Sequence, residues 1–382
     1  MTFDEDDVRR ALNARSAAPT PEFRGRLSAS LAERRRSPER MPSLAAVAAV
    51  VLAVVLTSVL IYMRAGSPTH VAAGPSPSPS PTPTGVAGVL TPPHGKIALP
   101  AFATLSAPSR DVVWALVLGQ DVYLYRSTDQ GHSWEQRPLP PAAGIVDLSF
   151  VSDREGWVSI TSSPAGQCES QAVQIWHTTD AGATWEPLGS HGIGAAQCKS
   201  ALSFVDPLHG FLDTSDPNGR PLIYHTSDGG KTWTASAPLA DPPGFTTRTG
   251  GFILEGDRVR SFGATLLVPV VGWSGDRSMY AYASTDGGAT WTYQATSPNP
   301  GGTLAFITAA HWLQVMLPGQ SEETDNGGTT WHASASDYDQ AAPVAPQVVF
   351  ADDQVGYATV RGEIKVTVDG GLHWSAINTP GT

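Results

Sequence analysis

Eight residues recur in nearly the same form six times in the last two-thirds of this 382-residue chain. The shared pattern is Ser/Thr-x-Asp-x-Gly-x-Ser/Thr-Trp, and it changes only at Asn326 in the fifth copy and His373 in the sixth. The third and eighth positions of the copies are, in order, Asp129 and Trp134, Asp180 and Trp185, Asp228 and Trp233, Asp286 and Trp291, Asn326 and Trp331, and Asp369 and Trp374. Such a series does not arise by chance, so the chain is built from a repeated structural unit.

The spacing of the copies gives the size of that unit. The third-position residues are 51, 48, 58, 40 and 43 residues apart, and a period of about 45 is typical of a four-stranded β-propeller blade. Extended apolar and aromatic runs, such as 122–126 and 279–283, precede the copies and predict strands. We therefore predict an all-β domain over residues 98–382, a six-bladed β-propeller, with seven blades left open if residues 98–110 complete another.

The residue types of the octad predict a structural role. Asp followed by Gly favours a tight turn, because Asp accepts N–H bonds two residues on and Gly tolerates positive φ. The Trp then opens the next strand and offers a large apolar face for burial. We interpret all twelve third- and eighth-position residues as hairpin staples between the last two strands of each blade. Asn326 would weaken a repeating metal site, and we predict no metal and no cofactor.

A second repeated element precedes some of the octads. It joins Leu-Ser-Phe or a similar run to an Asp, a Gly and an aromatic residue, at 148–157, 202–211 and 348–357. The octad resembles the Asp-box, or BNR repeat. Together the two elements resemble the Ycf48/HCF136-like photosystem assembly factors, and more distantly the sialidase-like propellers. The resemblance covers about residues 98–382 and implies a propeller that binds or assembles other molecules.

The N-terminal part has a different composition. Residues 43–63 carry no charge and are long enough to span a membrane as a helix, with Arg34, Arg35, Arg36 and Arg40 on their N-terminal side. These features predict a short, partly helical cytoplasmic tail over 1–42, a transmembrane helix over 43–63 and a single-pass protein with an extracellular or periplasmic propeller. A cleaved signal peptide is the alternative. Residues 64–97 are rich in Pro and Ser and predict an extended stalk.

Net charge and cysteine positions limit the class of binding partner and predict a disulfide. The formal net charge is −11, which argues against nucleic acid because phosphate contacts need clustered Lys and Arg. Cys168 and Cys198 fall in two loops that a propeller places on the face opposite the octads, so we predict a disulfide there. Two unpaired thiols are the alternative. The same face holds the long loops, whose candidate binding residues are Trp273, Asp276, Arg277, Asp216, Arg220, Phe245 and Arg248.

No catalytic motif stands out. A sialidase would need an arginine triad and an early Arg-Ile-Pro motif, and the motif is absent from the sequence. The ten arginines of 98–382 also form no cluster like the arginine patch associated with photosystem assembly. We therefore expect a non-catalytic module that binds a protein or glycan at the cell surface. The alternatives are an extracytoplasmic glycoside hydrolase and the receptor part of a transmembrane signalling protein.

Overall fold

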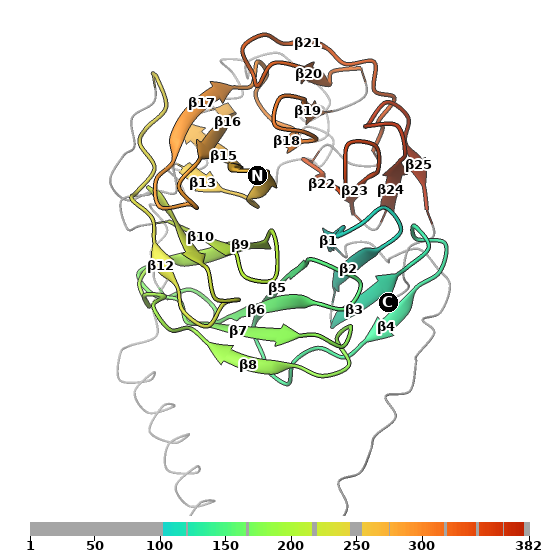
Figure 1. The fold of residues 1–382 in the computed structure, drawn as a ribbon. Coiled ribbons are helices and arrows are strands. Elements are labelled where there is room, and N and C mark those ends of the chain that lie inside the picture. The colour runs from blue at the N-terminus through green and yellow to red at the C-terminus, as the bar shows by residue number, and fades with distance from the viewer. Residues whose placement is uncertain are drawn as a thin grey trace, which may run out of the picture. The chain divides into compact units, whose positions relative to one another are not determined.

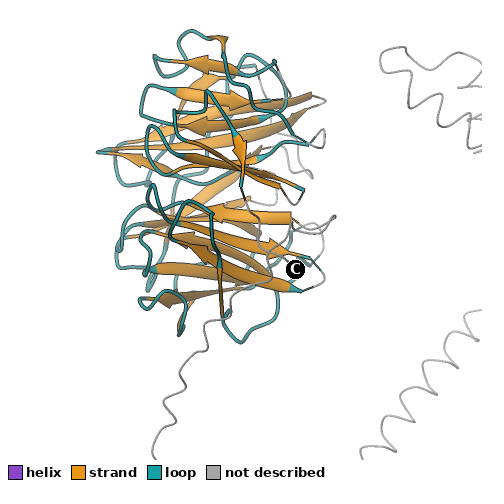
Figure 2. Ribbon diagram, turned by 90° about the vertical axis from the view of Figure 1, so that its right-hand side faces the viewer, coloured by secondary structure: helices purple, strands orange, loops and turns teal. Residues whose placement is uncertain are grey.

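The computed structural model describes residues 102–119, 121–165, 168–215, 220–244, 254–274, 276–316, 319–340, 344–361 and 363–377. The predicted tail, transmembrane helix and stalk lie outside these residues. In the described ranges, all regular secondary structure is β-strand (Figure 2). None of these residues belongs to a helix with the length and apolar character needed to cross a membrane.

Six antiparallel sheets make up the fold, and each is formed by consecutive strands. Blades one to three contain β1 (Phe102–Ser106), β2 (Val113–Leu118), β3 (Val122–Ser127) and β4 (Glu135–Arg137); β5 (Ile145–Phe150), β6 (Gly156–Thr161), β7 (Val173–Thr178) and β8 (Glu186–Gly189); and β9 (Cys198–Phe204), β10 (Gly210–Ser215), β11 (Pro221–Thr226) and β12 (Thr234–Ala235). Blades four to six contain β13 (Leu254–Gly256), β14 (Arg260–Phe262), β15 (Thr265–Ser274), β16 (Asp276–Ser284) and β17 (Thr292–Thr296); β18 (Thr303–Phe306), β19 (Trp312–Val315), β20 (Glu322–Thr324) and β21 (His332–Ala333); and β22 (Gln347–Phe350), β23 (Gly356–Val360), β24 (Glu363–Thr367) and β25 (Ser375–Ala376).

The blades form a closed ring with the first strand of each blade innermost (Figure 1). Six buried apolar clusters lie one between each pair of neighbouring blades, including blades six and one. At that last junction, the N–H of Leu105 donates to Oε1 of Gln347 at 2.6 Å. The described residues therefore close the ring with six blades and contain no seventh, which confirms the six-bladed prediction.

Packing explains the second sequence repeat. Phe150 ends the inner strand of blade two and lies opposite Gly156 on the next strand. A Cβ at Gly156 would lie 2.2 Å from the Phe150 ring, so only glycine leaves room for it. The free face of Phe150 stacks on Trp114 of blade one with ring centroids 3.7 Å apart, and its edge meets the octad residue Trp185. The phenylalanine thus joins its own blade to the preceding one.

The octads form the turns between the third and fourth strands, as predicted. In all six, the first-position hydroxyl donates to the third-position side chain at 2.7–2.9 Å and accepts the fifth-position N–H at 2.8–3.1 Å. The third-position oxygen accepts the seventh-position N–H at 2.9–3.0 Å. Asn326 preserves this pattern by donating its amide to the Thr330 hydroxyl at 2.7 Å.

Serines link successive inner strands around the centre of the ring. Ser106 accepts the N–H of Phe150, Ser149 that of Phe204, and Ser203 that of Val259, at 2.8–3.0 Å. Blade four ends this series, because Arg258 takes the place of the serine and the inner strand is broken into β13 and β14. The break brings two arginines to the centre of the propeller.

Candidate functional site: the central cavity

The propeller has two faces that strand direction defines. Because the sheets are antiparallel, the inner strands end on the same face as the octads; we call this the box face. The loops between second and third strands and the connections between blades lie on the opposite face. The sequence prediction put the binding residues on the opposite face.

Few of the predicted binding residues can be placed in detail. Asp216, Phe245 and Arg248 lie outside the described residues. Trp273, Asp276 and Arg277 lie at the tip of the β15–β16 hairpin, where Trp273 pairs with Arg277 and Ser274 with Asp276 along the backbone. The remaining residue, Arg220, is half exposed and lies 3.6 Å from a carboxylate oxygen of Asp241. Their role in binding stays a prediction.

On the opposite face, a disulfide and a buried lysine link blades two and three. Cys168 and Cys198 are joined with their Cα atoms 4.9 Å apart. The neighbouring Lys199 is buried, and its ammonium donates to the main-chain oxygens of Gln171, Ala195, Ala196 and Gln197 at 2.8–3.1 Å. Burial lowers the pKa of Lys199 to about 8. This lysine holds the two loops together, a role that no sequence pattern predicted.

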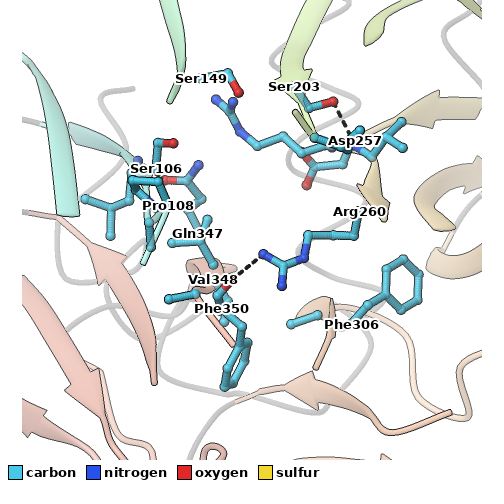
Figure 3. Close-up of a pocket in the computed structure, with 18 of the residues that line it drawn as sticks. Ser106, Pro108, Ser149, Ser203, Asp257, Arg260, Phe306, Gln347, Val348 and Phe350 are labelled. Atoms are coloured by element: carbon cyan, nitrogen blue, oxygen red, sulfur yellow. Dashed lines mark hydrogen bonds between the residues drawn. The ribbon is translucent and has the colours of Figure 1, made fainter. Parts of the chain in front are cut away.

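A cavity of about 260 Å³ lies in the centre of the ring. Its walls include the ends of inner strands, so it lies toward the box face rather than the predicted face. The lining includes Ser106 and Pro108 of blade one, Ser149 of blade two, Ser203 of blade three, Asp257, Arg258 and Arg260 of blade four, Phe306 of blade five, and Gln347 and Phe350 of blade six (Figure 3). Residues from all six blades therefore meet at one place, which makes this cavity the candidate site.

Arg258 uses its guanidinium to connect neighbouring blades. Its guanidinium forms an ion pair with Asp147 of blade two and donates to the main-chain oxygens of Leu148, at 2.6 Å, and of Leu202. Asp147 also accepts the N–H of Leu202 at 2.9 Å. The positive charge of Arg258 is thus matched by a carboxylate, and the side chain joins blades two, three and four.

Arg260 has a different environment. It projects into the cavity and donates to the main-chain oxygen of Phe350, across the ring in blade six (Figure 3). Its guanidinium lies 5.8 Å from the Phe262 ring centre. Burial lowers the pKa of Arg260 to about 10, so the side chain stays charged at neutral pH. The contact with Phe350 leaves most of its N–H donors directed at the cavity.

Two further polar sites, one at Asp213 and one at Glu323, were not predicted from the sequence. Asp213 of β10 is buried near blade four, and burial, with the charges of Glu255 and Asp257, raises the pKa of its carboxyl well above the usual range. In blade five, Glu323 lies between His311 and His332, whose Nε2 atoms are 3.6 and 3.1 Å from its oxygens. Within the described ranges, no three His, Cys, Asp or Glu side chains are arranged to hold a metal ion.

The fold and repeats define a class: a six-bladed Asp-box β-propeller with an arginine-lined centre. No family model matches the sequence. It is 31% identical over 140 residues to the photosystem II assembly lipoprotein Ycf48 of Synechococcus sp. (strain CC9902), covering 36% of each protein. The match thus spans about a third of that protein's length. This similarity supports the predicted resemblance to Ycf48-like β-propellers.

Several solved structures are similar to this chain at low sequence identity. A structure of Ycf48 bound to a D1 peptide is 18% identical, with a TM-score of 0.42 and coverage of 74% of this chain and 84% of that one. Ycf48 from Cyanidioschyzon merolae is 15% identical, with a TM-score of 0.41 and coverage of 72% and 96%. The GH74 enzyme of Niastella koreensis is 15% identical, with a TM-score of 0.44 and coverage of 71% and 46%.

Proposed function

We propose that this protein is a membrane-anchored, extracytoplasmic binding module that holds a protein partner and catalyses no reaction. The observation that carries the proposal is the central cavity, where Arg260 is charged and has no carboxylate beside it among the described residues. The sequence similarity to Ycf48, an assembly factor, supports a protein rather than a glycan as the partner. The anchor and location rest on the apolar segment 43–63 and the arginines before it.

The composition of the cavity favours binding over hydrolysis. A retaining or inverting glycosidase generally uses two carboxyl groups that flank the scissile bond. Asp257 is the single carboxylate among the described residues that line this cavity. Its side chain accepts the N–H of Arg258 at 2.8 Å. The cavity therefore offers positive charge and one acid, which suits recognition of an anion better than a two-carboxylate reaction.

Site-specific photo-crosslinking of the full-length protein in its own cells tests this function. A photoreactive phenylalanine analogue would replace Ser261, which lines the cavity, and in a second strain Arg220 on the opposite face. We expect a discrete protein adduct from position 261 and little from position 220. Adducts at neither position, together with glycosidase activity that the Asp257→Asn variant loses, would replace the binding module with the hydrolase.

Topology is tested separately in the same cells. Cysteines introduced singly in the predicted tail and in an exposed propeller loop would be labelled with a membrane-impermeant thiol reagent. Loop labelling without tail labelling is expected for a single-pass protein with a cytoplasmic N-terminus. The reverse pattern, or a mature protein that lacks residues 43–63, would contradict the predicted anchor.

A further inference from the structure

The central cavity contains a cation, Arg260, that is not neutralised by any carboxylate of the described residues. Among the described residues, the only hydrogen-bond partner of the Arg260 guanidinium is the main-chain oxygen of Phe350, and no carboxylate lies within the 4.0 Å ion-pair distance. Two residues earlier, Arg258 has the partner Asp147. The contrast shows that the fold supplies a counter-charge for one of the two arginines and leaves the other directed at the cavity.

A second donor lies on the facing wall. Oε1 of Gln347 accepts the N–H of Leu105 at 2.6 Å, and this bond fixes which way the amide is turned. The Nε2 group can donate two hydrogen bonds and has no acceptor among the residues that the structure describes. Figure 3 shows Gln347 and Arg260 entering the cavity from blades six and four. An anion between them would receive charge-assisted hydrogen bonds from both sides.

We propose that the central cavity binds a carboxylate presented by the protein partner, with Arg260 as the receiving cation and Gln347 as an additional donor. This inference rests on the proposed function and names the chemistry of its site. A planar carboxylate can accept two parallel hydrogen bonds from a guanidinium, which a point charge such as lysine cannot supply. Either an Asp or Glu residue of the partner or the partner's C-terminus provides the group.

The size and surroundings of the cavity favour this ligand. Its volume of about 260 Å³ is below the range of about 300–1,000 Å³ found for pockets that enclose whole small molecules. One acidic residue or one polypeptide terminus fits better than a long polymer. Burial also lowers the pKa of Arg260 to about 10, because the charge has lost much of its water. A bound carboxylate would offset that loss.

Arginine-detected NMR of the full-length protein in detergent tests the site directly. The Nε–H signals of the arginines, with Arg260 assigned from the Arg260→Gln variant, would be followed during titration with acetate as the simplest carboxylate. Arg154→Gln is the matched control, because it removes the same charge from an exposed loop of the box face outside the cavity. We expect a saturable shift of the Arg260 signal in the wild type and in the control.

Substitutions of Arg260 should weaken acetate binding to different degrees. Because both Arg260 substitutions remove the Arg260 signal, acetate binding to these variants would be followed through the side-chain amide signal of Gln347. Arg260→Gln should weaken binding by about tenfold or more, as loss of a charge-assisted pair implies. Arg260→Lys keeps the charge and loses the planar fork, so it should bind acetate more weakly than the wild type does. Thermal unfolding of all variants separates weakened binding from weakened folding. A signal that moves equally with chloride, or does not saturate by about 100 mM acetate, overturns the proposal.

Short peptides then identify the source of the carboxylate. Acetyl-Gly-Gly-Glu-amide offers an acidic residue, acetyl-Gly-Gly-Gly with a free C-terminus offers a terminal carboxylate, and acetyl-Gly-Gly-Gln-amide offers neither. At least one of the first two should compete with acetate, and the third should not. If neither competes while crosslinking still captures a protein, the carboxylate site is wrong and the binding function stands. If carboxylates bind but no protein is captured, the proposed function fails and the site stands.

Discussion

At the scale of single residues, the Asp-box shows how one carboxylate organises a turn. Hydrogen bonds from the hydroxyl and N–H of Thr290 hold the pKa of Asp286 well below its usual range. At Asp129, partial burial opposes ionisation, but bonds from Ser133 and Ser127 outweigh it and the pKa is again lowered. Asn326 makes the corresponding contacts without a charge.

This difference predicts a dependence on pH. A carboxyl whose pKa is lowered by folding contributes stability above its unfolded pKa of 3.8 and loses it as pH falls through the folded value. Asp286→Asn should therefore lower the thermal midpoint at pH 7, and the difference from wild type should shrink below about pH 4. Asn326→Asp should make the fifth box acid-sensitive. Equal differences at pH 7 and pH 3 would contradict this account.

Asp213 predicts the opposite dependence. Burial raises the pKa of this carboxyl above 3.8, so in that window the folded state holds a proton that the unfolded state has lost, and stability falls as pH rises. Asp213→Asn should raise the thermal midpoint at neutral pH, by about 2–4 °C for each kcal/mol of burial cost removed. At pH 3 the variant and wild type should converge. A lower midpoint at pH 7 would show that the charged form is needed.

At the scale of elements, the contact between an inner strand and its neighbour depends on one glycine. Gly156→Ala would place a methyl group 2.2 Å from the Phe150 ring, and overpacking of this kind costs about 1–3 kcal/mol. The free energy of unfolding from urea titration measures the effect. The double variant with Phe150→Leu should recover part of the loss, whereas a fully additive loss would mean that the ring is not the cause.

The loops of blades two and three depend on Lys199. Lys199→Met would remove the donor from four main-chain oxygens, at a cost of about 1–3 kcal/mol for buried groups left unpaired. Faster amide exchange is expected at Gln171 and Gln197, whose N–H groups bond to Ala195 and Cys168 in these loops. The exposed Lys231→Met is the control and should leave exchange unchanged. If amide exchange is unchanged in both variants, the disulfide rather than Lys199 holds these loops together.

At the scale of the whole molecule, the ring closes through side-chain contacts between its first and last blades. Gln347→Leu would leave the buried N–H of Leu105 without its acceptor, which costs about 1–3 kcal/mol. Because the lesion lies at the junction of the first and last blades, unfolding should also become less cooperative, with a smaller urea m-value. Gln354→Leu, on an exposed turn, should change neither quantity. An unchanged m-value in Gln347→Leu would mean that the apolar cluster between blades six and one is sufficient to close the ring.

The fold was largely accessible from sequence and the site was not. The octads and the second repeated element predicted the blades because their residues interact locally. Octad residues bond to others within four positions, and the Phe of the second element lies opposite a Gly on the next strand. Lys199, Asp213 and Arg260 gave no comparable signal, since their roles depend on which main-chain groups and charges surround them. One indication was present: the longest octad spacing, 58 residues, belongs to blade four, whose inner strand is the broken one.

The sequence alone determined the repeat, the six octad-bearing blades and the hairpins that join the last two strands of each. These features follow from hydrogen bonds between residues two and four positions apart; the Ser127 hydroxyl, for example, donates to Asp129 and accepts the N–H of Gly131. Only the tertiary structure decided that the cavity lies toward the box face and which arginine faces it. Arg260 meets Phe350 across 90 residues and Leu105 meets Gln347 across 242. Contacts at such separations form only when the ring closes, because closure alone brings inner strands from all six blades around one axis.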